Sequence, residues 1–156
     1  MNVSEPLRLS FEVDCPPEHA FRVWTARISR WWPADHTVSG EPALDVVLEP
    51  RVGGRIFERT AGGAEYEWGE VTVWEPPRRL GYLWHLRRDR ADATEVEITF
   101  LDGGAAPDGG AATTRVDIEH RGWDRLGAQG PGWREANRAG WSTLLPHFTA
   151  SCRRAD

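Results

Sequence analysis

The sequence predicts an α+β fold in which a seven-stranded antiparallel sheet wraps around one long C-terminal helix, with two short helices after the first strand. Seven segments place apolar residues at alternate positions, which is the pattern of strands with one buried face. The apolar spacing becomes helical only after the first strand and near the C-terminus. A length of 156 residues suits one core, so we expect residues 1–156 to form a single domain.

The first strand is expected at residues 7–13, where polar side chains alternate with Leu7, Leu9, Phe11 and Val13. Pro16 and Pro17 stand where a helix begins, and apolar residues then recur at helical spacings at Ala20, Phe21 and Trp24. A second short helix is expected to end at Trp32.

The other six strands are expected at residues 44–48, 55–60, 66–74, 78–86, 94–100 and 113–120. Glycine pairs at 53–54 and 62–63 mark turns between them, and the Pro76-Pro77 pair interrupts the chain before the fifth strand. The last two strands are expected to form a hairpin through the Gly- and Ala-rich residues 102–112.

Residues 132–148 have the period of an α-helix, with one apolar stripe formed by Trp133, Ala136, Gly140, Trp141, Leu144, Leu145 and Phe148. Pro146 lacks a backbone donor and is expected to bend this helix near Ser142. Because single-sided strands need a cover on their inner face, we expect the helix to lie across the sheet. A strongly twisted sheet around one helix leaves space between them, where a ligand could bind.

The composition argues against several classes of function. Hydrophobic residues make up 40% of the chain, but no apolar stretch suits a membrane span or a signal peptide, so we expect a cytoplasmic protein with no membrane partner. A net charge of −5 argues against nucleic acid as a partner. Cys15, Cys152 and the five histidines lack metal-ligand spacing, so we expect two free thiols, no metal and no cofactor.

Six motifs in order resemble a known family: PPEHAFRVWT, WWP, RVGGRIFE, GEVTVWEPPRRLGYLW, TRVDIEHRGW and the Gly140-Trp141 pair. The family is named after the activator of the heat-shock-protein-90 ATPase and belongs to the START-like (SRPBCC) superfamily. The resemblance covers about residues 7–150 and implies a helix-grip fold, like that of the birch pollen allergen. The superfamily includes lipid carriers, hormone receptors, polyketide aromatases and cyclases, and the co-chaperone domain.

The paired Trp31 and Trp32 leave two interpretations open. Adjacent helical residues point about 100° apart, so the two rings face different surfaces. Either one ring fills the core while the other caps the short helix, or one lines the mouth of a cavity. In the second case Pro33 ends the helix, and the loop to Gly40 forms part of a lid.

The inward face of each predicted element supplies the expected lining of a ligand cavity. It consists of Trp24, Trp31, Trp32, Ile56, Glu58, Val71, Tyr82, Trp84, Ile98, Phe100, Ile118, His120, Trp141, Leu144 and Leu145. A shift of one residue in register would exchange the faces of a strand, and would place Trp68 and Trp74 inside in place of Gly69 and Val71.

Glu58 and His120 are the polar residues of this lining. They could be rim residues that touch water, with an arginine as the partner of Glu58, or they could orient a polar group of the ligand or act as acid and base. Arg55 and Arg59 fall on the other face of the same strand and are expected to be solvated.

The leading hypothesis is a small-molecule binding protein, a monomer or homodimer without catalytic residues, whose cavity takes an apolar or aromatic ligand. The first alternative is an enzyme of aromatase, cyclase or hydrolase type that uses Glu58 and His120 in the same cavity. The second alternative is a module that stimulates a chaperone ATPase. The activator of this type has a further N-terminal domain, whereas only about six residues precede the first strand here.

Overall fold

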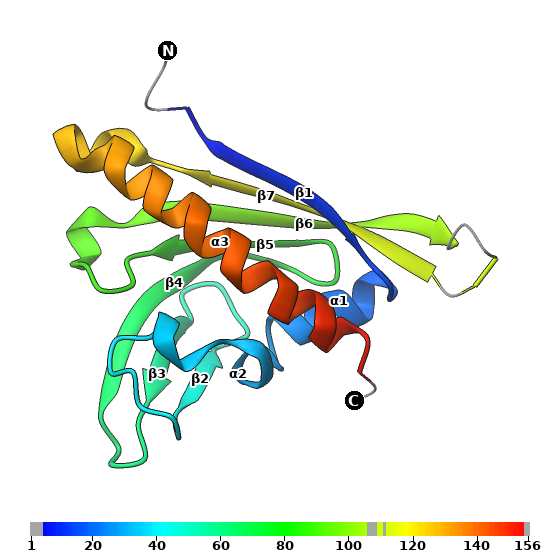
Figure 1. Cartoon of the computed structure of the whole chain (residues 1–156), viewed down its shortest axis with the longest axis horizontal. Helices are drawn as coiled ribbons and strands as arrows, with labels where there is room; N and C mark the ends of the chain where they lie inside the picture. Colours follow the sequence, from blue (N-terminus) through cyan, green and yellow to red (C-terminus); the bar gives the residue numbers. More distant parts are fainter. Residues whose placement is uncertain (1–4, 106–108, 111, 155–156) are drawn as a thin grey trace.

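The computed structural model describes residues 5–105, 109–110 and 112–154 (Figure 1). Seven strands form one antiparallel sheet in the order β1-β7-β6-β5-β4-β3-β2. Their bounds are β1 (Leu7–Val13), β2 (Asp45–Leu48), β3 (Arg55–Arg59), β4 (Glu65–Glu75), β5 (Arg79–Trp84), β6 (Thr94–Ala105) and β7 (Ala112–Arg121). The predicted strands are therefore confirmed in number, order and approximate position.

Three α-helices complete the fold: α1 (Pro17–Trp24), α2 (Ile28–Trp31) and α3 (Gly130–Cys152). Three 3-10 turns, which the sequence did not predict, lie at η1 (Ala34–His36), η2 (Arg90–Asp92) and η3 (Trp123–Gln129). Figure 1 shows α3 crossing one face of the sheet, with α1 and α2 beside its C-terminal half. This is the helix-grip arrangement that the family resemblance implies.

The β6–β7 hairpin is longer than the sequence predicts. Residues 102–112 were expected to form a loop, but the two strands stay paired as far as Ala105 and Ala112. The expected loop residues 106–108 and 111 lie outside the described residues. At the other end of the chain, α3 begins at Gly130 and continues through Pro146 to Cys152, and the bend near Ser142 stays a prediction.

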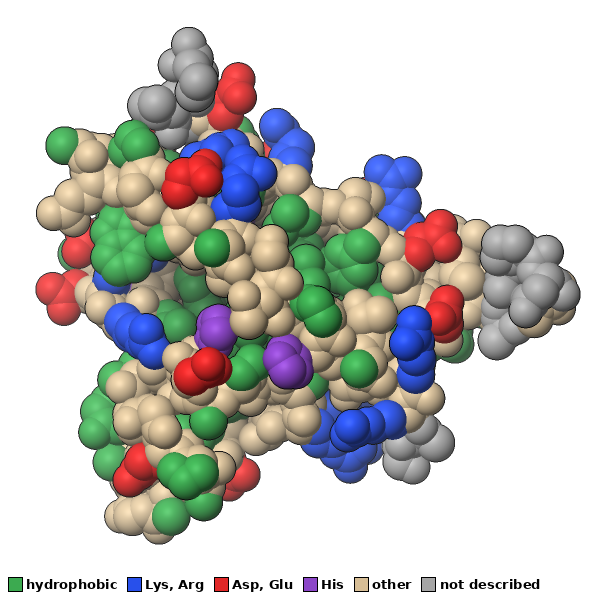
Figure 2. All heavy atoms as spheres, viewed as in Figure 1, with side chains coloured by type: hydrophobic (Ala, Val, Ile, Leu, Met, Phe, Trp, Pro, Cys, Tyr) green, Lys and Arg blue, Asp and Glu red, His purple; other side chains and the backbone are tan. Residues whose placement is uncertain are grey.

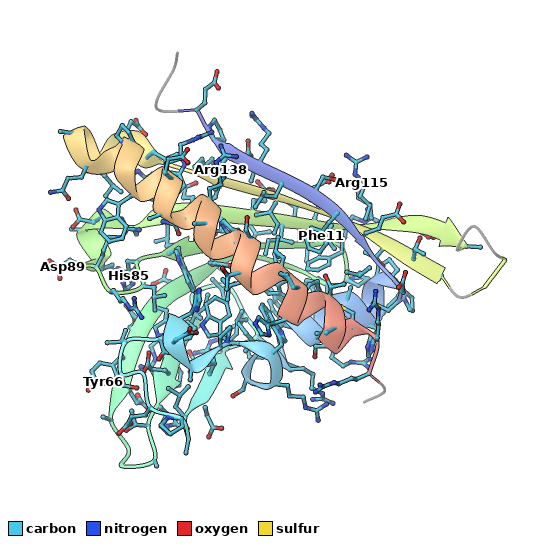
Figure 3. All side chains as sticks on the ribbon, in the orientation of Figure 1. Phe11, Tyr66, His85, Asp89, Arg115 and Arg138 are labelled. Atoms are coloured by element: carbon cyan, nitrogen blue, oxygen red, sulfur yellow. The ribbon has the colours of Figure 1, made fainter. Side chains whose placement is uncertain are left out.

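Aromatic side chains fill much of the space between α3 and the sheet. Trp24 is fully buried, with its ring centroid 4.8 Å from that of Phe148 on α3 and 5.1 Å from that of Trp31. Phe11 of β1, labelled in Figure 3, packs edge-on against Phe148 of α3. Cys15 and Cys152 are buried free thiols, as predicted. Burial of these large rings supplies the main driving force that holds α3 in place.

Two β-bulges interrupt the regular alternation of faces that the sequence predicts for β4. The sequence offered a choice between Gly69 with Val71 and Trp68 with Trp74 as the inward pair. Both bulges lie in β4: its pairing with β3 skips Trp68, and its pairing with β5 skips Thr72. Each bulge adds one residue to a strand and so resets the alternation of faces. As a result Trp68, Val71 and Trp74 all contact the interior: Trp68 near Trp32, Val71 in the core cluster and Trp74 against Phe21.

The backbone of β5 leaves no room for a side chain at Gly69. A Cβ atom there would lie 2.0 Å from the Leu83 carbonyl oxygen of β5. We therefore expect Gly69→Ala to lower the free energy of unfolding by about 1–3 kcal/mol, the usual cost of overpacking. Gly132→Ala is the control, since a Cβ there meets nothing within 4 Å, and it should leave stability unchanged or raise it. Urea titrations of both variants test this, and equal stabilities would contradict it.

Candidate functional site

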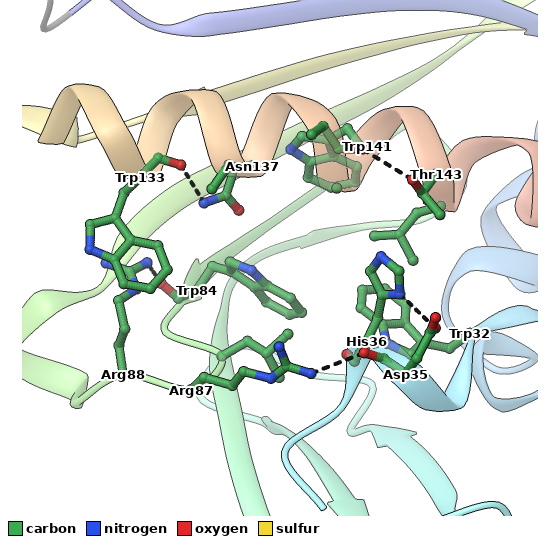
Figure 4. A pocket seen from close by; sticks show the side chains of 15 residues that line it. Trp32, Asp35, His36, Trp84, Arg87, Arg88, Trp133, Asn137, Trp141 and Thr143 are labelled. Atoms are coloured by element: carbon green, nitrogen blue, oxygen red, sulfur yellow. Dashed lines mark hydrogen bonds and ion pairs between the residues drawn. The ribbon is translucent and has the colours of Figure 1, made fainter. Parts of the chain in front are cut away.

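A pocket of about 370 Å³ opens between α3 and one end of the sheet (Figure 4). Three segments form its walls: residues 32–36, the end of β5 with the turn that follows it, and the middle of α3. The lining residues are Trp32, Asp35, His36, Trp84, Leu86, Arg87, Arg88, Trp133, Ala136, Asn137, Ala139, Gly140, Trp141, Thr143 and Leu144. Figure 2 shows the hollow with hydrophobic side chains inside it and charged side chains at its edge.

Three other hollows on the surface are larger, but none of them is lined by Trp32, Trp84 or Trp141. One, of about 920 Å³, is lined largely by charged and polar side chains, among them Glu65, Glu67 and Asp92. A second, of about 540 Å³, lies beside Phe21 and Trp74, away from the part of α3 that lines the 370 Å³ pocket. A third, of about 490 Å³, is lined largely by charged and polar side chains of β1, β6 and β7. We therefore treat the pocket against α3 as the candidate site, and call it the α3 pocket.

Tryptophan rings form the apolar part of the α3 pocket. Trp32 and Trp84 have ring centroids 5.7 Å apart, and Trp141 contributes from the helix. Trp32 also packs on Trp68, with centroids 5.0 Å apart, so a second layer of buried rings supports the first. Trp133 stands at the mouth, half-buried. The arrangement answers the question raised by the adjacent tryptophans: Trp31 fills the core, whereas Trp32 lines the pocket.

Arg87 and Arg88 bring positive charge to the same pocket. Arg87 has φ of 62°, a left-handed conformation that is uncommon for a residue with a side chain. Its guanidinium donates from Nε to the Thr37 carbonyl at 2.9 Å and from Nη2 to the Asp35 carbonyl at 3.0 Å. Arg88 lies with its guanidinium carbon 4.8 Å from the centre of the Trp133 ring, a cation–π contact.

Asp35 and His36 form a hydrogen-bonded pair on the wall that residues 32–36 supply. The His36 Nδ1 atom lies 2.8 Å from Oδ1 of Asp35, and this hydrogen bond is the main cause that lowers the pKa of the Asp35 carboxyl. Trp32 donates from its indole Nε1 to the His36 carbonyl at 2.9 Å. The pocket thus combines aromatic surface, two guanidinium groups and one carboxylate–imidazole pair.

Only some of the apolar residues predicted to line a cavity do so in the structure. Four of the predicted residues do line the α3 pocket: Trp32, Trp84, Trp141 and Leu144. Eight others are buried and pack against one another in the core: Trp24, Trp31, Ile56, Val71, Tyr82, Ile98, Phe100 and Ile118. Leu145 is half-buried beside the core. These inward-facing side chains fill the space themselves, so the pocket lies at one end of the helix–sheet interface.

Glu58 faces inward as predicted, but its hydrogen-bond partners are backbone amides and an indole, and not an arginine. It is fully buried and accepts hydrogen bonds from the Val38 amide at 2.6 Å, the Ser39 amide at 2.9 Å and the Trp68 indole at 2.8 Å. Burial alone would raise the pKa of this carboxyl, but the hydrogen bonds outweigh it and lower the pKa. Glu58 thus neither touches water at a rim nor pairs with an arginine, and it holds the loop behind residues 35–37.

His120 is also fully buried, and both ring nitrogens have partners. Trp141 donates from its indole Nε1 to Nδ1 at 3.1 Å, and Nε2 lies 2.7 Å from the Thr94 hydroxyl. Thr94 in turn donates to the Trp84 carbonyl at 3.3 Å, so the neutral ring with its proton on Nε2 fits every bond. Burial, aided by the charge of Arg88, lowers the pKa of His120 to about 3. A histidine that stays neutral and fully bonded is not a rim residue and is not available as a base.

Sequence reasoning missed the polar residues of the α3 pocket. Asp35, His36, Arg87 and Arg88 lie in turns, where no periodicity indicates which way a side chain points. Three further lining residues, Trp133, Ala136 and Gly140, did carry a signal, since they belong to the apolar stripe of the terminal helix. Arg55 and Arg59 fall on the outer face, as expected, where both guanidinium groups stack on Phe57 and pair with Glu65.

Comparison with known proteins places the chain in a family. The family model for the Activator of Hsp90 ATPase homolog 1-like protein matches residues 14–151. The chain belongs to this family. A search of curated proteins found no match. Within the part of the chain that the structure describes, no helix is long and apolar enough to cross a membrane.

Solved structures support the same assignment. The chain is 30% identical to the anthrahydroquino-gama-pyrone synthase Txn09, covering 97% of this chain and 99% of that one with a TM-score of 0.63. It is 26% identical to CalC, a self-sacrificing resistance protein from Micromonospora echinospora, over 97% and 96% of the two chains with a TM-score of 0.65. Protein MLL2253 from Mesorhizobium loti shares the fold at 22% identity, 97% and 98% coverage and a TM-score of 0.65.

The burial of His120 predicts a specific dependence of stability on pH. Its folded pKa of about 3 lies below the ordinary value of 6.5, so between these pH values the unfolded chain binds a proton that the folded chain does not. The free energy of unfolding should therefore be highest above pH 6.5 and fall by about 1.4 kcal/mol per pH unit as the pH decreases from there. Urea unfolding at pH 7.5, 6 and 5 measures the slope. His120→Asn should flatten it and His147→Gln should not, and a flat wild-type profile would contradict the account.

Removing the charge of Glu58 should loosen the loop that it holds. Glu58→Gln replaces an acceptor by an amide that cannot satisfy all three donors, so we expect a loss of about 1–3 kcal/mol in the free energy of unfolding at pH 7. Because the folded pKa of Glu58 is lowered, its contribution is present above pH 4.5 and is lost as the pH falls through the folded pKa. The deficit should therefore shrink in acid. Glu41→Gln, at an exposed position, is the control, and equal losses in both variants would refute the role.

Proposed function

We propose that this protein binds a small apolar or aromatic molecule in the α3 pocket. The observation that carries the proposal is the cluster of Trp32, Trp84 and Trp141 around a pocket of about 370 Å³. Ligand pockets typically enclose about 300–1,000 Å³ and are lined mainly by apolar and aromatic side chains with a few polar groups. The volume is near the lower end of this range, which favours a ligand of modest size.

The shape and chemistry of the lining favour a flat ring system. Flat rings stack on indole surfaces, and stacked or edge-on aromatic pairs contribute about 0.5–1.5 kcal/mol beyond the burial of area. Arg87 and Arg88 favour a ligand that carries an oxygen substituent with negative charge or partial negative charge. A sugar or a phosphate ester would leave most of the indole surface without a partner.

The relatives give this proposal independent support. Txn09, at 30% identity over nearly the whole of both chains, is a synthase for an anthrahydroquino-gama-pyrone, as its name states. Such a compound is a fused aromatic ring system with oxygen substituents, which is the ligand chemistry that the α3 pocket favours. The proposal for this chain rests on its own pocket and takes the relative as support.

The two alternative functions have weaker support. An enzyme that uses Glu58 and His120 is not favoured, because neither residue lines the α3 pocket and both are fully hydrogen-bonded. The chaperone-stimulating alternative has as support the family assignment and the fold of an HSP90 activator from Plasmodium falciparum, at 18% identity and a TM-score of 0.52. An identity this low bears on the fold alone.

Intrinsic tryptophan fluorescence tests ligand binding directly. Fatty acids, sterols, flavonoids and hydroxylated anthraquinones are titrated into the wild-type protein, and flat aromatic members should quench the emission in a saturable way. Gly140→Leu should weaken this binding at least about tenfold, or about 1.4 kcal/mol, because Gly140 lines the pocket and a Cβ there meets open space.

Gly132→Leu is the matched control for this experiment. Gly132 also lies on α3 with open space at its Cβ position, but it does not line the pocket. This variant should bind like the wild type. The proposal fails if no compound quenches the emission, or if the two leucine variants bind equally well.

A further inference from the structure

Two side chains of the α3 pocket fix the backbone of residues 35–37. Arg87 donates to the carbonyls of Asp35 and Thr37, and Trp32 donates to the carbonyl of His36 between them. The Thr37 hydroxyl closes the turn by donating to the Ala34 carbonyl at 2.6 Å and accepting from the Gly40 amide at 2.9 Å. Three successive carbonyls held in this way make the position of His36 rigid.

The His36 ring has one bonded nitrogen and one available nitrogen. Because Nδ1 lies 2.8 Å from the Asp35 carboxylate, the proton of the neutral ring belongs on Nδ1. Nε2 accepts no hydrogen bond from any residue that the structure describes, and the side chain is 25% exposed at the pocket wall. Figure 4 shows the imidazole standing between the Asp35 carboxylate and α3. A carboxylate-bound imidazole with a free, basic nitrogen is the arrangement of a general base.

No other histidine has this arrangement at the pocket. The structure describes all five, and only His36 lines the α3 pocket. Both nitrogens of His120 are occupied in the core. His147 lies on the exposed side of α3, outside the pocket.

Arg87 supplies the complementary charge. Its Nε and Nη2 atoms hold the backbone on either side of His36, while Nη1 has no partner among the described residues. The guanidinium is thus anchored next to the base with one donor group left for an anion. Arg87 also has a left-handed backbone conformation, which is the kind of strain found at functional sites.

We propose that Asp35, His36 and Arg87 form a proton-transfer site in the α3 pocket for flat aromatic compounds that bear an acidic C–H or O–H group. In the step, the C–H or O–H bond breaks and its proton moves to Nε2 of His36. The electron pair stays on the substrate as an enolate or phenolate beside Arg87. Asp35 is a positioning residue that stabilises the imidazolium, which later returns the proton to the substrate. The inference rests on the proposed binding function.

The elimination of 5-nitrobenzisoxazole measures this chemistry without knowledge of the natural substrate. The probe is a flat apolar bicycle. A base removes its C3 proton, the C–H electrons form a nitrile, and the ring N–O bond breaks to leave a coloured phenolate. The wild-type protein should accelerate this reaction above the rate in buffer. His36→Gln should lower kcat at least about tenfold, since a positioned base typically contributes a factor of about 10²–10⁴.

Matched variants separate chemistry from binding. His19→Gln removes a histidine of α1, outside the pocket, and should retain the wild-type rate. Asp35→Asn should lower kcat while KM stays within about twofold, because Asp35 acts on the base and not on the probe. In His36→Ala, added imidazole should restore turnover, which a structural loss would not allow.

The outcomes distinguish this inference from the binding function. Turnover in His36→Gln or Asp35→Asn equal to that of the wild type overturns the proton-transfer site, and so does a wild-type rate no faster than buffer. In either case the fluorescence titrations of the same proteins still decide the binding function. If aromatic compounds quench the emission of the wild type and of His36→Gln alike, and the two proteins do not differ in turnover, the protein binds such compounds but does not transfer protons by this site.

Discussion

The hydrogen-bonded chain from Trp141 through His120 and Thr94 to the Trp84 carbonyl fixes the terminal helix relative to the sheet. It joins α3 to β7, β6 and β5 inside an otherwise apolar interior, where each bond is worth more than it would be in water and each unpaired group would cost more. Two of its four members, Trp84 and Trp141, are also pocket residues. The distance between helix and sheet, and with it the pocket, therefore depends on this chain.

A second set of bonds makes the opposite wall of the pocket equally rigid. Glu58 binds the amides of Val38 and Ser39, while Arg87 binds the carbonyls of Asp35 and Thr37. The segment that carries Trp32 and His36 is thus tied to β3 on one side and to the end of β5 on the other. A wall fixed before a ligand arrives loses little conformational entropy when the ligand binds. Buried polar residues that do not touch the pocket contribute in this way by holding those that do.

The sequence predicts the architecture well and the site only in part, for physical reasons that particular residues make clear. Alternating apolar residues locate all seven strands because each strand buries one face, and the stripe from Trp133 to Phe148 locates the terminal helix. The sequence left open which face of the sheet Trp68 lies on, because a bulge adds one residue to the strand and the alternation of apolar residues does not reveal it. Glu58 and His120 were placed on the correct face, but their partners lie far away in the sequence. His36 and Arg87 lie in turns, whose side chains have no periodic direction.

The fold itself does not determine function, since one scaffold carries many activities, so the account depends on the contents of the α3 pocket. The indole N–H signals in a nitrogen–proton correlation NMR spectrum test this most directly, because the chain has nine tryptophans at defined depths. Titration with a hydroxylated anthraquinone should shift the signals of Trp32, Trp84, Trp133 and Trp141 and leave that of Trp74 unmoved. Shifts confined to Trp74, or no shift in the four pocket signals at saturation, would contradict the account.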